Sequence, residues 1–314
     1  MYRLLIILFI LATPLAKAAK EEVPYWISYP GAKDTVLSDF YFKTEFRVKD
    51  SVESAPLKVA ATGRIQLWVN NYFVIYDGDA SASVEEPHIF VTDIRKFLQK
   101  GDNAITICLT PVSPKDFNND KVALALAVNK DKQIYSDEDF ECFRQKANNY
   151  KTVNVEGETY VTFAFNAQDN IVGNWHEAGF DAKKFSPEKW LEPEEGSVFK
   201  TEETETTYIP KPVSRTYDVT NTSFPQPVKT GTKIEIELPA GKQLMVEAGF
   251  ESVKDKTVSI YSPEMAQKGI KHSYKTTFGA QSFFFPVIMK TDKLIFEFHA
   301  PMKFIGVTYR IINE

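Results

Sequence analysis

The sequence has few of the residues that build metal or redox sites. Its 314 residues include two cysteines and four histidines. The histidines are widely separated: His88, His176, His272 and His299. No pair of these residues has the spacing of a zinc site. No glycine-rich phosphate loop, Gly-x-Ser-x-Gly or His-Glu-x-x-His motif occurs either. We therefore predict no metal, no cofactor and no catalytic residue.

The two cysteines, Cys108 and Cys142, allow at most one disulfide bond. An exported protein could oxidise them. The alternative is that Cys108, inside the apolar segment 104–109, is a small buried residue. We favour this alternative because a chain of this length can bury a core without a covalent staple. Pairing of Cys108 with Cys142 stays open at this point.

The sequence also has no large excess of positive or negative charge. The chain carries 37 Lys and Arg against 42 Asp and Glu, a net charge of −5, and the two signs are interspersed. Nucleic acids and anionic membranes attract strongly basic surfaces. We therefore expect neither as a partner, and expect a neutral or mildly polar ligand instead.

Long apolar runs are absent after the first residues of the chain. Residues 4–15 are apolar and are followed by Ala16-Lys17-Ala18, a small-x-small cleavage pattern. This is typical of a signal peptide, with cleavage after Ala18. The run is too short to span a membrane comfortably. We predict a periplasmic or secreted protein that has no membrane contact after the signal is removed.

Aromatic residues, in contrast, are abundant and favour strands. They make up 13% of the sequence, with 24 Phe, 14 Tyr and 4 Trp, and helical heptads are absent. Short alternating segments recur between turns along the chain. The sequence therefore predicts an all-β protein of two β-sandwich (jelly-roll-like) domains. Short helical turns are expected near Ile94 and Pro187, and residues 136–147 fit either a helix or an irregular connection.

The predicted organisation has four parts. Residues 1–18 are the signal peptide, 19–195 the first sandwich, 196–207 a linker and 208–314 the second sandwich. Six glutamates and almost no apolar residues mark the stretch 192–207, which indicates a passage between domains. A solvated edge strand is an equally good interpretation of its second half.

A β-hairpin is predicted at 63–76, because Asn70-Asn71 suits a type I′ turn. The predicted pairs are Val69 with Tyr72, Trp68 with Phe73, Leu67 with Val74, Gln66 with Ile75, and Ile65 with Tyr76. Alternation then predicts a core face of Ile65, Leu67, Val69, Tyr72, Val74 and Tyr76. The opposite face carries Arg64, Gln66, Trp68, Phe73 and Ile75, and needs some cover.

Several segments resemble the N-terminal β-sandwich of bacterial α-L-rhamnosidases, and similar jelly-roll sugar-binding domains of other glycosidases. The matching residues are Trp26-Ile27-Ser28, Gly63…Leu67-Trp68-Val69-Asn70-Asn71 and Asp93…Phe97-Leu98…Gly101-Asp102-Asn103-Ala104-Ile105. The segment 134–140 resembles that family's "Thr-Asp-x-x-Trp" passage, with Phe140 in place of Trp. The segment 177–190 resembles its "Gly-Glu-x-Tyr-Asp-Ala-Arg…Trp" stretch.

The resemblance implies a galactose-binding-like, non-catalytic half of a glycosidase. In those enzymes an (α/α)6 barrel follows the sandwiches and supplies the acid and base carboxylates. This chain ends at Glu314 in a strand-like segment, so those carboxylates have no matching positions. We therefore expect no hydrolysis of α-rhamnosides.

The candidate carbohydrate-binding residues are the outward aromatics of the hairpin and their expected neighbours: Trp68, Phe73, Asp77, Trp175 and His176. A sugar ring can stack its C–H face on an indole, and Asp77 would accept hydrogen bonds. His176-Glu177 beside Trp175 reads as a sugar-contacting loop or an acid/base pair. The structural alternative is that residues 136–190 or the second sandwich cover Trp68.

Three classes of function follow. The first is an exported carbohydrate-binding or accessory protein of polysaccharide degradation. Its partner would be a plant or bacterial glycan, including rhamnose-containing ones, with a protein partner in a glycan-degrading system. The second is a glycosidase-like enzyme with a site at the sandwich interface, which a pair of carboxylates in a cleft would favour. The third is a structural or protein-binding β-protein, favoured if the aromatic faces are buried between domains.

Overall fold

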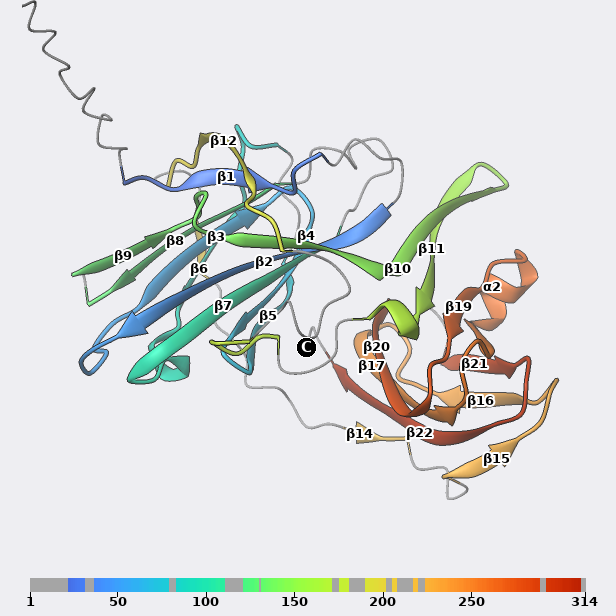
Figure 1. Cartoon of the computed structure of the whole chain (residues 1–314). Helices are drawn as coiled ribbons and strands as arrows, with labels where there is room; N and C mark the ends of the chain where they lie inside the picture. Colours follow the sequence, from blue (N-terminus) through green and yellow to red (C-terminus); the bar gives the residue numbers. More distant parts are fainter. Residues whose placement is uncertain are drawn as a thin grey trace, which may run out of the picture.

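The computed structural model describes residues 22–31, 37–78, 83–110, 121–129, 131–170, 175–180, 190–201, 205–207, 217–219, 224–288 and 292–311. These residues form an all-β protein, as the sequence predicts (Figure 1). The predicted signal peptide, residues 1–18, lies outside them. No helix in the described ranges is long and apolar enough to cross a membrane.

The first sheet has seven strands in the order β12-β1-β8-β3-β6-β13, with β9 beside β8. Its strands are β1 Tyr25–Ser28, β3 Pro56–Ala61, β6 Ile89–Asp93, β8 Lys121–Val128, β9 Lys132–Tyr135, β12 Glu194–Val198 and β13 Glu205–Thr207. The stretch predicted as a linker, 196–207, therefore contains strand residues of this sheet. β13 lies at an end of the sheet, as the edge-strand interpretation expects.

The long sheet has ten strands in the order β16-β21-β18-β19-β11-β10-β2-β7-β4-β5. Its strands are β2 Leu37–Val48, β4 Arg64–Val69, β5 Tyr72–Gly78, β7 Gly101–Thr110, β10 Glu141–Val155, β11 Glu158–Asn166, β16 Lys233–Glu237, β18 Thr257–Tyr261, β19 His272–Lys275 and β21 Lys293–Phe298. Its halves meet where β11 pairs in parallel with β19. Both halves of the chain thus share one sheet (Figure 1).

The third sheet has five strands in the order β14-β22-β17-β20, with β15 beside β22. Its strands are β14 Tyr217–Asp218, β15 Gln226–Val228, β17 Gln243–Ser252, β20 Gly279–Ile288 and β22 Met302–Ile311. One hydrophobic core draws its residues from the first sheet and from β2, β4, β5 and β7 of the long sheet. A second core draws on β16, β18, β19 and β21 and on the third sheet, and Phe163 of β11 packs into it.

Among the described residues, helix is confined to two 3-10 turns and one five-residue α-helix. The turn expected near Ile94 is the 3-10 helix η1 Arg95–Phe97, and a second one is η2 Ala167–Asp169. The turn expected near Pro187 lies outside the described residues. The helix α2 Pro263–Gln267 was not predicted. Its N-cap residue is Ser262, a residue type common at this position, and the Ser262 hydroxyl accepts from Met265 N at 3.2 Å.

Two local expectations are wrong. Residues 141–147, expected to be helical or irregular, belong to strand β10, because pairing with β2 outweighs the local helical pattern. In the hairpin, Val69–Tyr72 and Trp68–Phe73 pair as predicted, but Leu67 pairs with Ile75 and Ile65 with Gly78. Each shift is a β-bulge that adds a residue to β5. Ile75 is therefore buried, whereas Tyr72, expected in the core, is 58% exposed.

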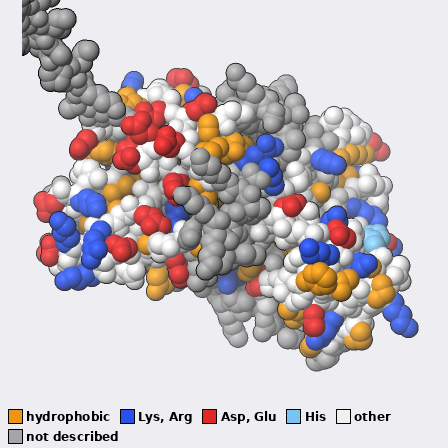
Figure 2. Space-filling model, in the orientation of Figure 1, with side chains coloured by type: hydrophobic (Ala, Val, Ile, Leu, Met, Phe, Trp, Pro, Cys, Tyr) orange, Lys and Arg blue, Asp and Glu red, His pale blue; other side chains and the backbone are white. Residues whose placement is uncertain are grey.

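Charged side chains of both signs are interspersed on the face shown in Figure 2, as the net charge suggests. Acidic side chains gather near β1 and β12 in the same view. Strand β12 pairs with β1 at the edge of the first sheet, and all five of its residues are exposed. Charges on such an exposed strand discourage pairing with another chain at this edge.

Candidate functional site

The outward residues of the hairpin form the base of an aromatic cluster. Trp68 and Phe73 lie opposite each other on β4 and β5, and their rings stack with centroids 4.5 Å apart and planes 3° apart. Both side chains are half-buried. The hairpin register around Asn70 thus places two parallel rings on the outer face of the long sheet, as the sequence predicts.

A loop of residues 175–180 packs on these rings. The centroid of Trp68 lies 5.6 Å from that of Trp175 and 4.7 Å from that of His176. Trp175 also meets Tyr41 of β2 edge to face, at 4.4 Å. The name aromatic cluster is used below for Trp68, Phe73, Trp175 and His176. The structure therefore brings together four of the five predicted site residues; Asp77 is in β5, but its side chain lies outside the described part of the chain.

Two residues of β2 hold this loop in place, and the sequence analysis missed both. Lys43 is 4% exposed, and its ammonium donates to Glu177 O at 2.8 Å and pairs with the Glu45 carboxylate at 2.6 Å. Glu45 accepts from Gly179 N at 3.0 Å. Asn71 at the hairpin turn donates to the Glu177 carboxylate. Nothing in a Lys-Thr-Glu strand sequence predicts these contacts, because they depend on a loop more than 130 residues away.

The imidazole of His176 is held neutral. Burial, and secondly the positive charge of Lys43, lower its pKa to about 4. At neutral pH one ring nitrogen therefore donates a hydrogen bond and the other accepts one. A ring of this kind matches a sugar hydroxyl, which also both donates and accepts.

Behind the aromatic cluster, a chain of ring contacts leads from Tyr41 into the protein interior. Tyr41 stacks on Phe143 of β10, with centroids 6.2 Å apart, and Phe143 stacks on Trp190 at 5.4 Å. Phe143 and Trp190 are buried, whereas Trp175 is only half-buried. The passage 136–190 therefore covers Trp68 in part, as the structural alternative expects, and leaves an aromatic rim at the surface.

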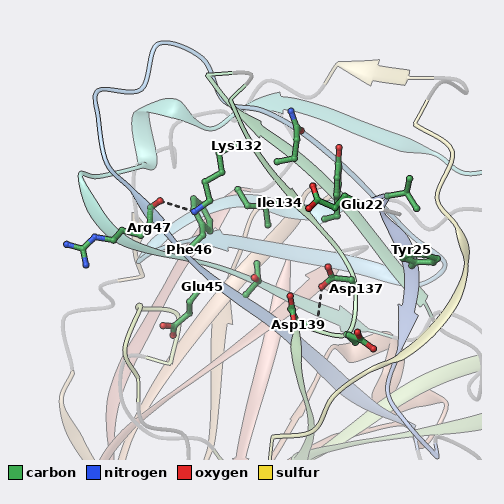
Figure 3. Close-up of a pocket in the computed structure, with 14 residues that line it drawn as sticks. Glu22, Tyr25, Glu45, Phe46, Arg47, Lys132, Ile134, Asp137 and Asp139 are labelled. Atoms are coloured by element: carbon green, nitrogen blue, oxygen red, sulfur yellow. Dashed lines mark hydrogen bonds between the residues drawn. The ribbon is translucent and has the colours of Figure 1, made fainter. Parts of the chain in front are cut away.

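An open cleft of about 670 Å³ adjoins the loop (Figure 3). Glu45 of β2 lines this cleft and also accepts from Gly179 N of the loop. The cleft lies between β2 and β9, over the buried side chains of Phe46 and Ile134. Five acidic and two basic residues are among its described lining: Glu22, Glu45, Asp137, Glu138, Asp139, Arg47 and Lys132. Sequence reasoning did not find this cleft, because its two walls are separated by more than 80 residues. No group of three or more His, Cys, Asp or Glu suited to a metal occurs among the described residues.

Neither a family model nor a curated protein sequence matches the chain. Its structure, however, is similar to that of an α-L-rhamnosidase from Aspergillus terreus, with a TM-score of 0.62 and 14% identity over 92% of this chain and 36% of that one. For the enzyme from Dictyoglumus thermophilum the TM-score is 0.59 and the identity 13%, over 92% and 35%. This chain folds like part of an α-L-rhamnosidase.

A third such structure is the Streptomyces avermitilis α-L-rhamnosidase complexed with L-rhamnose, with a TM-score of 0.58 and 14% identity over 88% of this chain and 28% of that one. The chain thus spans about a third of the length of these enzymes. The fold expected from the rhamnosidase-like motifs is therefore present. At such low identity the likeness extends to the fold alone.

Proposed function

We propose that the chain is an exported, non-catalytic carbohydrate-binding protein that works beside glycan-degrading enzymes in the periplasm or outside the cell. The observation that carries this proposal is the half-buried aromatic cluster, in which Trp68 stacks on Phe73 and Trp175 and His176 pack against Trp68. Half-buried aromatic rings beside neutral hydrogen-bonding groups are a suitable surface for a sugar, which has apolar C–H faces and a polar rim.

The groups around the cluster suit a neutral glycan. The apolar face of a sugar ring packs on the exposed rim of the indoles, and the neutral His176 imidazole exchanges hydrogen bonds with a hydroxyl. The amide of Asn71 and the carboxylate of Glu177 lie at the same rim and are joined by a hydrogen bond. Plant or bacterial glycans that contain rhamnose are the first to test, because the fold is that of part of an α-L-rhamnosidase.

We expect no hydrolysis by the chain alone. A glycosidase needs two carboxyl groups placed on either side of the scissile bond. Two carboxylates at the loop of the cluster are already hydrogen-bonded within the protein, since Lys43 and Gly179 N bind Glu45, and Asn71 binds Glu177. Turnover of an aryl α-rhamnoside by the pure protein, abolished by replacing one carboxylate, would overturn this part of the proposal.

A glycan array tests binding. The mature chain should retain a restricted set of glycans, and Trp68→Ala should lose them while its melting temperature changes little. Phe278→Ala is the matched control, because Phe278 is an aromatic residue 65% exposed in the second half of the chain. Absence of any retained glycan, together with a loss of several kcal/mol of stability in Trp68→Ala, would make the cluster a structural element.

A further inference from the structure

The cleft of Figure 3 lies between β2 of the long sheet and β9 of the first sheet. Each of these strands has an edge there that pairs with no described strand. In the first sheet, β9 pairs with β8 and with no other described strand. In the long sheet, pairing between β10 and β2 begins at Glu141 and Lys43. Residues 44–48 of β2 therefore have β7 on one side and no described strand on the other.

Backbone hydrogen-bonding groups of both edges point toward this opening. In β2, Arg47 O accepts from the Lys132 ammonium at 2.9 Å across the cleft, so that it faces away from β7 (Figure 3). Backbone direction alternates along a strand, so the groups of Glu45 face the same way. In the first sheet, Ser136 N donates to Leu124 O, and the same alternation turns the groups of Gln133 outward.

The walls of the cleft suit an extended polypeptide with basic side chains. Phe46 and Ile134 form an apolar floor and are 8% and 9% exposed. Carboxylates dominate the rim, and Asp139 lies at an exposed turn that Asp137 stabilises by accepting from its N–H at 2.9 Å. Alternating residues of a bound strand would face the floor and the rim in turn.

We propose that this cleft binds an extended, lysine- or arginine-containing segment of another protein, which pairs with residues 44–48 of β2 and continues the line of β10. Addition of a strand to an open sheet edge is an established mode of peptide recognition, in which main-chain hydrogen bonds supply affinity and side-chain pockets supply specificity. This site lies beside the aromatic cluster, and the proposal does not rest on glycan binding there.

Lys132 occupies part of the place that the added strand needs. Its ammonium is hydrogen-bonded to Arg47 O and lies 5.5 Å from the centre of the Phe46 ring. An N–H of the incoming segment would replace this ammonium at the same carbonyl oxygen. Lys132 therefore competes with the partner and repels its basic side chains.

Fluorescence anisotropy tests the proposal with the full mature chain and a labelled eight-residue peptide that alternates lysine with threonine or valine. This peptide should bind, more weakly as salt is raised. A peptide with glutamate in place of lysine, and a lysine peptide with alternate backbone nitrogens methylated, should both fail to bind. Equal binding of the methylated peptide would overturn the proposal, because it would show attraction by charge alone.

Variants of the cleft separate charge from backbone pairing. Arg47→Gln removes a positive charge and should tighten binding slightly. Arg47→Pro removes the same charge and the outward N–H, and should weaken binding about tenfold relative to Arg47→Gln. Lys132→Met keeps the packing on Phe46 and should tighten binding about threefold or more. Equal affinities for the two Arg47 variants would contradict strand addition.

Two controls make the outcome independent of the proposed function. Asp137→Asn with Asp139→Asn should weaken peptide binding about three- to tenfold, whereas Glu86→Gln, exposed and outside the cleft, should not change it. Trp68→Ala should leave peptide binding unchanged. If the Asp137 and Asp139 changes instead abolish retention of a glycan, the cleft is a sugar site and the proposal is wrong.

Discussion

His272 is a neutral histidine at the junction between the two halves of the chain. Its ring stacks on Phe163 of β11, with centroids 4.1 Å and planes 4° apart, and its Nδ1 accepts from Phe163 N at 3.2 Å. Burial lowers its pKa to about 4. Protonation would remove the acceptor of this hydrogen bond, because both ring nitrogens of an imidazolium are donors.

The pKa of His272 predicts a loss of stability in weak acid. Between pH 6.5 and about 4 the unfolded chain binds a proton that the folded chain does not, so the free energy of unfolding falls as pH is lowered through this window. The contribution is at most about 3 kcal/mol, and His176 acts in the same direction. Urea unfolding at pH 4.5 and 7 should show a smaller difference in His272→Gln than in His299→Gln. An equal difference would contradict this role.

Cys108 and Cys142 are buried thiols on opposite faces of the long sheet. They pair with consecutive residues of β2, Tyr41 and Phe42 respectively, and consecutive residues of a strand point to opposite sides. Burial raises the pKa of Cys142 to about 12 and that of Cys108 well above its usual value. Both are therefore protonated and unreactive at neutral pH.

We predict that reductant leaves the melting temperature unchanged and that Cys108→Ser costs about 1 kcal/mol of stability, by a modest loss of packing. Thermal melts with and without dithiothreitol, and urea unfolding of the variant, measure these effects. A large fall of the melting temperature on reduction would instead reveal a Cys108–Cys142 bridge.

At the scale of the element, the pairing of β10 with β2 is interrupted where β10 passes from the first core to the second. Gln145 pairs with Asp39, but the next paired residue, Tyr150, lies opposite Leu37. Asp39 is 6% exposed and accepts from the hydroxyls of Thr110 and Tyr150 and from the amide of Asn148. One buried carboxyl thus fixes the path of the strand.

Asp39→Ala should cost about 3 kcal/mol or more in the free energy of unfolding, because it leaves three donors without their acceptor. Asp39→Asn should cost less, since its amide oxygen still accepts. Asp102→Ala is the control: its carboxylate is 68% exposed in a loose pair with Arg47, and the expected change is within about 0.5 kcal/mol. Chemical denaturation of the three variants measures this, and similar values for Asp39→Ala and Asp102→Ala would refute the role of Asp39.

Most strands could be predicted, because alternation and turn residues are local signals. Three short segments rich in apolar residues, 40–48, 57–61 and 122–128, lie within β2, β3 and β8. The bulges of β5 and the strand nature of residues 141–147 could not be predicted, because they follow from pairing with distant strands. The same holds for Lys43 and Glu45 at the site, whereas the stacking of Trp68 on Phe73 follows from the turn at Asn70-Asn71.

At the scale of the whole molecule, one sheet joins two cores. Phe163 of β11 belongs to the second core, and Phe165 packs on Tyr274, with ring centroids 5.5 Å apart. Residues from before position 170 therefore help to complete the packing of the second half. The predicted division into two domains, joined by a linker at residues 196–207, stays a prediction.

Because the long sheet is continuous, we predict a single cooperative thermal transition for residues 19–314. Differential scanning calorimetry should give a calorimetric enthalpy equal to the van't Hoff enthalpy. Phe163→Ala should lower the whole transition rather than split it, with Phe278→Ala as an exposed control. Two resolved transitions in the unmodified chain would show that the halves unfold independently.

Protection of tryptophan by a glycan tests the central claim most directly. Trp26 and Trp190 are buried, so Trp68 and Trp175 of the half-buried aromatic cluster are the tryptophans most accessible to acrylamide. A glycan retained on the array should, at saturation, reduce acrylamide quenching of the protein, and a glycan that is not retained should leave it unchanged. A retained glycan that binds without changing the quenching would place the sugar elsewhere and contradict binding at the aromatic cluster.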